Sequence, residues 1–444
     1  MWIIRFIRKV AKYFNRINPL PGPFPFPYFG NLPQLYIGHG GNLKTFYDFN
    51  HKKYGDLYEI HFDVRIIVLN RTEYIEKLLL VSTKNPFIMI ISEDNTKGFH
   101  ELGIMGTGLL LNQEYKSWRY NRHFFTQTIL SPKFVHEAIY WTNKLSYTMA
   151  GYFNELNDNE KTERPSALVD ETNKSDDMKK NLKFLNQKFD SIIKKRRQEI
   201  ENSPLDKPLS NDMLTSVIIA NTPRDINYDR NVNDRSMRSM RYLEIRGIIF
   251  DGIVAGTDTT ANTISYIIYY LVHNPDIKKK MMDEIDKVFR DDKTRPITEN
   301  DIHNLKYCEA IVKEVSRIFP VLNTFRRSLE KPEGLAGYQW PANTSIRVSI
   351  DAIHYNSEYW DEPEKFNPDR WMVENSFITF GGGLRICPGR KLAMIELVCL
   401  MVLIFRKYEI DLANKEAPLK TVSSVMTICT ELLVEIRLRN KIFV

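Results

Sequence analysis

The stretch FGGGLRICPGR, residues 380–390, contains five glycine and proline residues and a single cysteine, Cys387. The apolar run KLAMIELVCLMVLIF, residues 391–405, follows at once. Glycine permits positive φ values and lets backbone approach a flat ligand where a side chain would block it. A thiol at the start of a helix lies at the positive end of the helix dipole, which favours the thiolate. We interpret the stretch as a loop that presents a thiolate as a metal ligand, in front of a buried helix.

Cys387 also fits an inert thiol in a helix N-terminal turn, because most buried cysteines are structural. The spacing F-x-x-G-x-R-x-C-x-G, formed by Phe380, Gly383, Arg385, Cys387 and Gly389, favours the first interpretation. This spacing resembles the haem-binding signature of the cytochrome P-450 family, the haem-thiolate monooxygenases. The resemblance implies that Cys387 is the axial thiolate of the iron of haem b. It also implies that Arg385 binds a haem propionate, that Phe380 packs beside the sulfur, and that the backbone at Gly383 admits the porphyrin.

The segment GIIFDGIVAGTDTTANTISYIIYYLVHNP, residues 247–275, predicts a long, largely apolar helix. Its centre, residues 255–260, is polar, and Asp258 must be paired, solvated or protonated there. Threonine hydroxyls in such a helix can bond to the carbonyl one turn back. Alone, the motif also fits a small-residue patch for a close helix crossing. It resembles the family's oxygen-activation motif, which implies that Thr259 donates a hydrogen bond over the distal face of the haem and that Asp258 relays protons from solvent.

Three further basic or aromatic residues match haem-contacting positions of the family. Trp118 and Arg122 in SWRYNR are four residues apart and so lie one turn apart on a helix. By themselves they fit an aromatic–cation pair on an amphipathic helix. The resemblance implies that both bind haem propionates. Arg327 matches another propionate ligand, although Arg326 beside it leaves that assignment open.

Glu314 and Arg317 in KEVSRIFP are three residues apart and share one helix face. An exposed ion pair of this kind contributes only about 0–1 kcal/mol and has little diagnostic value. Arg370 in EPEKFNPDRWM completes the pattern. The resemblance implies a buried Glu–Arg–Arg network that braces the haem loop as a structural element.

Composition sets the broad class of the protein. The chain has 444 residues, of which 43% are hydrophobic and 26% charged, the balance of an ordinary globular protein. Its net charge of +7 is modest, and it carries no nucleic-acid-binding motif, so a basic surface suits an acidic protein or anionic lipid. The four cysteines form no C-x-x-C pair, which gives no support to a disulfide framework or a zinc site and indicates a reducing compartment.

We predict a mainly α fold with small β-sheets: the cytochrome P-450 fold, as a single large haem-binding domain over residues 36–444. Residues 56–70 predict paired strands, 112–148 predict helices, and 337–350 and 425–440 each predict a hairpin. Residues 152–240 form a poorly packed roof region, shorter than the family normally has. One helix within it, residues 181–200, has its apolar side chains on one face: Leu182, Phe184, Leu185, Phe189 and Ile192.

Residues 1–17 carry apolar side chains at helical spacing with arginine and lysine between them. A spanning helix needs about 20 mainly apolar residues, so we predict a short amphipathic helix on an anionic membrane surface. A mitochondrial transit peptide is the alternative, because no acidic residue precedes Asp48. Residues 18–35 are proline-rich and predict a stiff hinge. The expected location is the cytosolic face of the endoplasmic reticulum membrane, with the mitochondrion as the alternative.

The resemblance implies a haem-thiolate monooxygenase that inserts one oxygen atom from O2 into its substrate. Residues 99–111 and 425–433, the segments expected to line the pocket, are apolar and predict a lipophilic substrate. The electrons come from NADPH through a flavoprotein reductase, which we expect to dock on basic residues such as Arg390 and Lys391. Two alternatives remain. One is a haem-thiolate isomerase or dehydratase that acts without O2, although such relatives tend to have lost the acid–alcohol pair. The other is a non-catalytic relative disabled by the shortened roof region.

Overall fold

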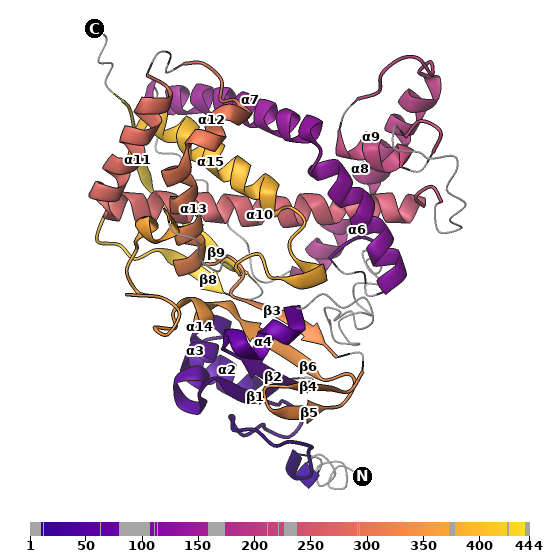
Figure 1. Cartoon of the computed structure of the whole chain (residues 1–444), viewed down its shortest axis with the longest axis vertical. Helices are drawn as coiled ribbons and strands as arrows, with labels where there is room; N and C mark the ends of the chain where they lie inside the picture. Colours follow the sequence, from indigo (N-terminus) through magenta and orange to yellow (C-terminus); the bar gives the residue numbers. More distant parts are fainter. Residues whose placement is uncertain are drawn as a thin grey trace.

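The computed structural model describes residues 10–79, 107–158, 174–225, 238–372, 378–423 and 426–439, apart from positions 12, 63, 111, 113, 211, 221, 291, 293 and 330. Helices dominate this part of the chain, and the strands form one four-stranded and three two-stranded sheets (Figure 1). The predicted mainly α fold with small sheets is confirmed. Among the described residues, no helix combines the length and the apolarity that crossing a bilayer requires.

The four-stranded sheet has the order β1-β2-β6-β3. Strands β1 (Leu57–His61) and β2 (Arg65–Leu69) form the predicted antiparallel pair. Strand β6 (Ser345–Ser349) then pairs parallel with β2 and antiparallel with β3 (Thr324–Ser328). The sheet lies in the lower part of the molecule in Figure 1 with four helices near it: α2 (Leu32–His39), α3 (Leu43–Tyr54), α4 (Thr72–Leu79) and α14 (Ile350–His354).

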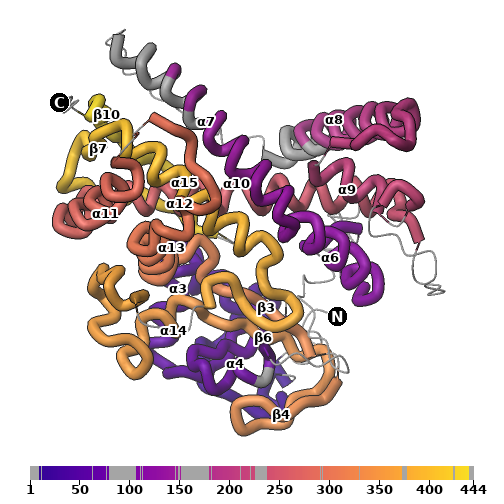
Figure 2. Tube along the Cα trace, turned by 45° about the horizontal axis from the view of Figure 1, so that its top comes forward, coloured from indigo at the N-terminus to yellow at the C-terminus, as the bar shows by residue number. Residues whose placement is uncertain are grey.

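The larger, helical part is built around α10 (Tyr242–His273), which runs across the molecule. Helices α13 (Lys306–Ile318) and α15 (Arg390–Lys407) pack against it and against each other, and α7 (Pro132–Asp158) packs on α15 (Figure 2). These helices share the largest hydrophobic core, in which Tyr266, Ile311 and Met401 are fully buried. The remaining helices lie at its edges: α6 (Tyr115–Ile129), α8 (Lys174–Asn202), α9 (Met213–Ile219), α11 (Pro275–Val288) and α12 (Glu299–Asn304).

The proline-rich segment is bonded to the first strand. Glu59 in β1 is buried, and its carboxylate pairs with Arg16 and with Arg65, whose Nε lies 2.9 Å away. The same carboxylate accepts the backbone N–H of Leu20 at 3.3 Å. Arg65 also donates to the carbonyl of Ile17 at 2.6 Å. The segment predicted as a hinge is therefore held against the sheet at its N-terminal end.

Two strand predictions are wrong in their pairing. Within residues 425–440, β9 (Thr427–Glu431) pairs with β8 (Lys420–Ser423), while β10 (Val434–Leu438) pairs with β7 (Tyr408–Leu412). Within 337–350, β5 (Tyr338–Trp340) pairs with β4 (Glu333–Leu335), and β6 joins the four-stranded sheet. Alternation along a strand identifies which face is buried, but it does not identify the partner strand.

The helix predicted at residues 181–200 exists as part of α8, but the predicted apolar face is wrong in part. Phe189 is buried, whereas Phe184 and Ile192 are 56% and 52% exposed. The buried face instead includes Ile193 and Ile200. Because α9 and α10 pack against α8, they decide which side of the helix is covered.

Candidate functional site

The cysteine loop is closed by its own backbone. Cys387 lies three residues before α15, and its N–H donates to the carbonyl of Phe380 at 2.9 Å. Gly381 and Gly383 have φ values of 69° and 65°, which other residues rarely adopt. A Cβ on Gly383 would lie 2.7 Å from the carbonyl oxygen of Leu79 at the end of α4. Glycine is therefore required here both for the turn and for the contact with α4.

Burial raises the pKa of the Cys387 thiol. The backbone N–H groups of Gly389 and Arg390 and the guanidinium of Arg122 act in the opposite direction. The helix start therefore favours the thiolate as expected, but burial has the larger effect on the pKa and favours the thiol. A bound metal ion would reverse this balance, since a coordinating thiol is deprotonated outright.

Trp118 and two arginines lie together beside the loop. The Arg385 guanidinium carbon lies 4.1 Å from the centre of the buried Trp118 ring, and that of Arg122 lies 5.9 Å from it. Arg122, one turn after Trp118 in α6, donates to the carbonyl of Ile386, next to Cys387. Helix α6 therefore contacts the cysteine loop through the pair that the sequence singled out.

Arg327 in β3 completes a cluster of three arginines with Arg122 and Arg385. Burial, followed by the charges of Arg327 and Arg122, lowers the pKa of Arg385 to about 9. Burial alone lowers the pKa of Arg327 to about 10, and Arg327 is only 4% exposed. Arg326 lies opposite Arg347 on the neighbouring strand β6, and burial together with the positive charge of Arg326 lowers the pKa of Arg347. The structure thus places Arg327 rather than Arg326 beside Arg385.

The three clustered arginines have no carboxylate within ion-pair distance among the described residues: Arg122, Arg327 and Arg385. Buried cations without a counter-ion are costly, and a natural protein normally pairs them. Two carboxylates on a ligand bound over the cysteine loop would supply the missing charge. A haem, with one iron for the thiolate and two propionates for the arginines, fits this donor set.

The centre of α10 is exposed although its flanking turns are buried. Ile253 and Val254 are 50% and 42% exposed, and Asp258 is exposed beside them. The hydroxyl of Thr259, which is half-buried, donates to the carbonyl of Ala255 at 2.6 Å, as predicted for threonine in this position. Apolar surface left open in the middle of a central helix is typical of a ligand-binding face.

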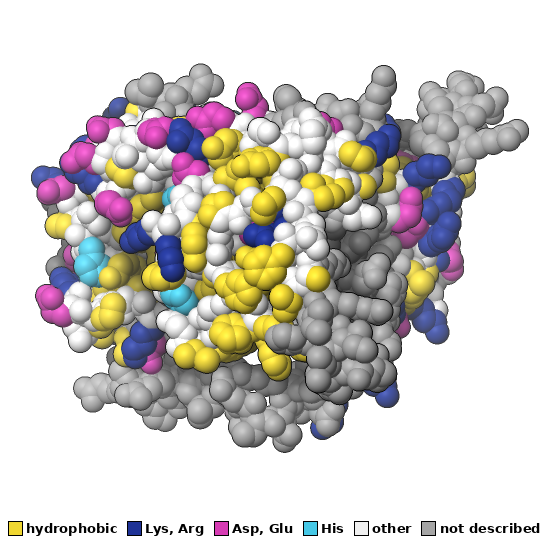
Figure 3. Space-filling model, turned by 90° about the horizontal axis from the view of Figure 1, so that it is seen from below, with side chains coloured by type: hydrophobic (Ala, Val, Ile, Leu, Met, Phe, Trp, Pro, Cys, Tyr) yellow, Lys and Arg dark blue, Asp and Glu magenta, His cyan; other side chains and the backbone are white. Residues whose placement is uncertain are grey.

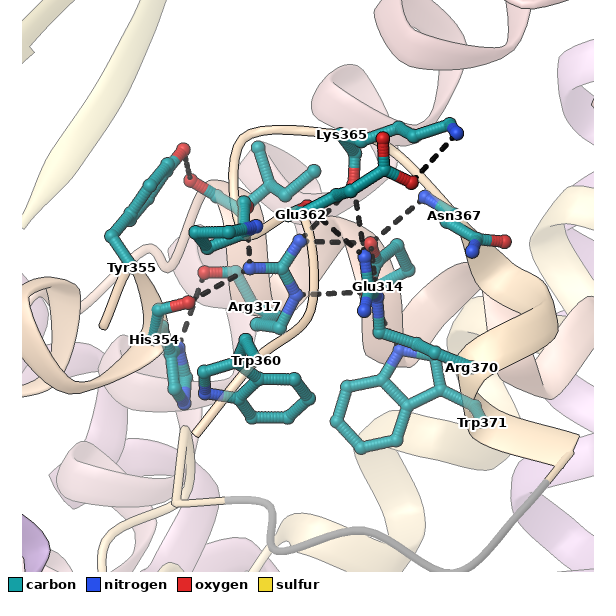
Figure 4. A network of polar contacts seen from close by, with 12 residues as sticks. Glu314, Arg317, His354, Tyr355, Trp360, Glu362, Lys365, Asn367, Arg370 and Trp371 are labelled. Atoms are coloured by element: carbon teal, nitrogen blue, oxygen red, sulfur yellow. Dashed lines mark hydrogen bonds and ion pairs between the residues drawn. The ribbon is translucent and has the colours of Figure 1, made fainter. Parts of the chain in front are cut away.

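The Glu–Arg–Arg network is present, with Glu314 and Arg317 fully buried and the Arg370 side chain 10% exposed (Figure 4). Glu314 accepts from Arg317 Nε and Nη2 at 2.9 Å each and from Arg370 Nε at 3.1 Å. Both Glu314 and Arg317 are 0% exposed, so the surface ion-pair interpretation is wrong. Sequence reasoning missed Trp371, whose Nε1 donates to Glu314 at 2.8 Å, and Asn367, whose N–H donates at 2.9 Å. The sequence signal that could have identified Trp371 is its position directly after Arg370.

The network reaches several parts of the segment that precedes the cysteine loop. Arg317 donates to the carbonyls of His354 and Pro363 at 2.8 Å each. Thr379, just before the loop, donates to the carbonyl of Ser316 on α13 at 3.3 Å. The buried ion cluster therefore fixes this segment to α13, as the resemblance implied.

The cysteine loop carries the thiol, three arginines cluster beside it, and the centre of α10 leaves an apolar face open. Together these features are those of a haem-protein site. The sequence model of the cytochrome P450 family matches residues 20–171 and 142–436, so the chain belongs to this family. Its members bind haem iron through a cysteine thiolate and are monooxygenases. The two matched stretches overlap after α6, in the region that the sequence indicates is short.

Curated relatives agree with the family assignment. Tabersonine 16-hydroxylase 1 of Catharanthus roseus is 27% identical over 447 residues, covering 87% of this chain and 85% of the relative. A cytochrome P450 of Caenorhabditis elegans is 34% identical over 200 residues, covering 43% of this chain and 38% of the relative. Steroid 17-alpha-hydroxylase/17,20 lyase of Mesocricetus auratus is 29% identical over 259 residues, covering 55% and 48%.

Glu314→Ala should lower the free energy of unfolding by about 3–5 kcal/mol, because it leaves two buried guanidiniums without their carboxylate. Urea titration of the purified protein measures the change. Lys365→Ala is the matched control, since it removes an ion pair in which both partners are about 60% exposed and should change stability by less than about 0.5 kcal/mol. Equal losses in the two variants would contradict a structural role for the buried network.

Proposed function

We propose that this chain inserts one oxygen atom from O2 into a lipophilic substrate with electrons from NADPH, delivered by a flavoprotein reductase. The observation that carries the proposal is the cluster of one buried and two partly buried arginines beside the Cys387 loop, Arg327 with Arg122 and Arg385, which have no carboxylate partner among the described residues. In this proposal, Cys387 holds the haem iron, and Phe380 and Gly383 line the sulfur loop. The propionates are bound by Trp118, Arg122, Arg327 and Arg385.

Haem, when bound, supplies a redox-active iron whose thiolate ligand favours O–O cleavage. The protein's own contribution is proton delivery and positioning. Asp258 is exposed, so its carboxylate can exchange protons with water. Thr259 follows it on the helix, and its hydroxyl oxygen retains accepting capacity while its proton is held by the Ala255 carbonyl. We assign the relay to these two side chains.

The lipophilic substrate is inferred from the exposed apolar groups of the site. Ile253 and Val254 on α10 are open, and Leu110 on the segment after Gly108 is 44% exposed. Residues 99–106, which the sequence also places at the pocket, lie outside the described residues. Two relatives are named as hydroxylases of tabersonine and of a steroid. A hydrophobic small molecule is the substrate class that agrees with both observations.

Cys387→Ser should abolish the carbon-monoxide difference band of thiolate-ligated haem, because a serine oxygen cannot replace the thiolate. The measurement is the reduced carbon-monoxide spectrum of the expressed protein, together with its haem content. Cys429→Ser is the control, since Cys429 lies on β9, outside the cysteine loop, and should keep the band. A wild-type-like band in the Cys387 variant would overturn the proposed ligand. NADPH and O2 consumption with reductase then separates a monooxygenase from an O2-independent isomerase.

The reductase surface is inferred from a groove beside the cysteine loop. A cavity of about 500 Å³ lies along one face of α6, and Arg119, Arg122 and His123 contribute its basic side chains. Its other lining residues are uncharged: Tyr115, Trp118, Thr126, Gln127, Leu130 and Leu384. Arg390 and Lys391 are exposed at the start of α15. A basic surface next to the thiolate suits an acidic flavoprotein domain.

Reversing both charges, as Arg390→Glu with Lys391→Glu, should slow electron transfer from the reductase about tenfold at low salt, because charge complementarity steers association. Stopped-flow reduction under carbon monoxide measures the rate, and the difference should shrink as salt screens the charges. Lys194→Glu with Lys195→Glu on α8 is the matched control, because both lysines are exposed on another element. An unchanged rate in the first variant would mean that the reductase docks elsewhere.

Attachment to a membrane surface is the final part of the proposal. Figure 3 views the molecule from below, and hydrophobic side chains gather on this face with basic ones among them. The N-terminal segment contributes large exposed apolar side chains, including Phe14, Phe24 and Phe29, at 55–65% exposure. The amphipathic helix predicted for residues 1–17 lies mostly outside the described residues, although residues 10, 11, 13 and 14 are helical. We propose the cytosolic face of the endoplasmic reticulum, with the mitochondrion as the alternative.

Phe24→Ser with Phe29→Ser should reduce binding to anionic lipid vesicles several-fold, because each exposed ring contributes apolar area to the contact. Co-sedimentation with vesicles of phosphatidylserine and phosphatidylcholine measures the bound fraction. Leu205→Ser, at an 83% exposed position on the far segment after α8, is the control. Equal binding by all three proteins would exclude this surface from the membrane contact.

A further inference from the structure

Asp251 is a buried carboxylate of α10 that the proposed reaction does not use. It is 5% exposed, and its Oδ2 accepts two backbone N–H groups, from Leu109 at 2.5 Å and Leu110 at 2.7 Å. These amides lie about 140 residues away in the sequence. No arginine, lysine or histidine pairs with this carboxylate among the described residues. One carboxylate oxygen therefore accepts two hydrogen bonds from a single backbone segment, of which residues 107–110 and 112 are described.

Two glycines bring that segment into direct contact with the helix. A Cβ on Gly108 would lie 2.2 Å from Oδ2 of Asp251, and a Cβ on Gly247 would lie 2.6 Å from the backbone nitrogen of Gly108. Real Cβ atoms do not approach so closely. Any larger residue at these positions would push the segment away from α10 and break the two bonds to Asp251.

The opposite side of the same segment holds the cysteine loop. Arg385 donates to the carbonyl of Leu109 at 3.1 Å and to that of Asn112 at 2.8 Å. Leu109 therefore gives its N–H to α10 and its carbonyl to the cysteine loop. The buried amide of Asn121 on α6 adds a third attachment, at 2.6 Å from the carbonyl of Thr107.

We propose that Asp251 is a positioning residue, which holds the segment of Leu109 and Leu110 against α10 so that the carbonyls of Leu109 and Asn112 fix the Arg385 guanidinium beside the cysteine loop. Asp251 precedes Asp258 and Thr259 by seven and eight residues, so all three share one face of the helix. One strip of α10 thus carries both the proposed proton relay and the attachment that orients a propionate-binding arginine. The link to haem rests on the function proposed above, whereas the attachment itself does not.

Hydrogen exchange of the peptide that contains residues 107–112 tests the attachment directly, in the protein with or without haem. Asp251→Ala should make the Leu109 and Leu110 amides exchange about tenfold to a hundredfold faster, because charge-assisted bonds protect them. Asp251→Asn should stay within about threefold of wild type, since its amide oxygen can accept both N–H groups. Thr257→Ala is the control on the same helix, because the Thr257 hydroxyl donates to the carbonyl of Ile253 within α10 and not to the segment after Thr107.

Gly108→Ala is the second variant, in case Asp251→Ala does not accumulate. It leaves the carboxylate in place but forces the segment away from it, so it should show the same rapid exchange as Asp251→Ala. Wild-type exchange in Gly108→Ala, or in a folded Asp251→Ala, would overturn the proposal. So would rapid exchange in Thr257→Ala, because protection would then depend on helix stability in general.

The step from Asp251 to Arg385 is tested by the rate of haem transfer to an acceptor apoglobin. Asp251→Ala and Arg385→Gln should each speed haem loss about tenfold, and the double variant should lose haem no faster than Arg385→Gln alone, because both changes release the same guanidinium. If the rate increases of the two single variants multiply in the double variant, Asp251 acts independently of Arg385, and the positioning role is overturned. If no variant or wild-type protein takes up haem, the proposed function fails while the exchange result still stands.

Discussion

Three clustered arginines that lack a carboxylate partner among the described residues set the main constraint on this protein: Arg327, which is buried, and Arg122 and Arg385, which are partly buried. Burial lowers the pKa of each, which means that the folded chain holds positive charge in a place that disfavours it. Backbone carbonyls accept hydrogen bonds from all three arginines but bring no negative charge, which a ligand with carboxylates would supply. The same small region contains the Cys387 thiol, whose neutral form burial also favours. A ligand that carries a metal ion and two carboxylates satisfies both groups at once.

The rest of the structure holds these groups in position from several directions. The Glu314 cluster fixes the segment before the cysteine loop to α13, and its Glu314–Arg317 ion pair is fully buried. Helix α6 presents Trp118 and Arg122 to the loop from one side. The segment after Gly108 links α10 to Arg385 from the other. The cysteine loop is therefore held by contacts from α6, α13 and the segment after Gly108 together.

The region between α6 and α10 differs from the rest of the chain. The two stretches matched by the family model overlap within it, at residues 142–171. Helices α8 and α9 still bury part of their apolar surface against the N-terminal half of α10, through Ile193 and Val217. Even so, Phe184 and Ile192 remain exposed on α8, as do Ile253 and Val254 on α10. The open apolar surface on both helices is consistent with a short roof region, and none of the haem-contacting motifs lies within it. The division into a hinge, a membrane helix and a roof remains a prediction from the sequence.

The sequence by itself determined the family, the helical class and the residues around the cysteine. Those features are local: glycines at positive φ, a thiol before a helix, and charged residues one helical turn apart can be read from spacing alone. Glu314 and Arg317 have little diagnostic value as a pair. Together with Arg370 they indicated the buried network, because the three occur in the family's order along the chain.

Only the tertiary structure decided which surfaces meet. It chose Arg327 over Arg326, because strand β3 turns one of the two neighbours toward Arg385 and the other toward Arg347. It assigned β9 and β10 to different sheets and selected the buried face of α8. It also paired Asp251 with the backbone of Leu109 and Trp371 with Glu314, residues that lie far from them in the sequence. Periodicity fixes the direction of a side chain relative to its own element, but the neighbour on that side comes from long-range packing, which no local pattern encodes.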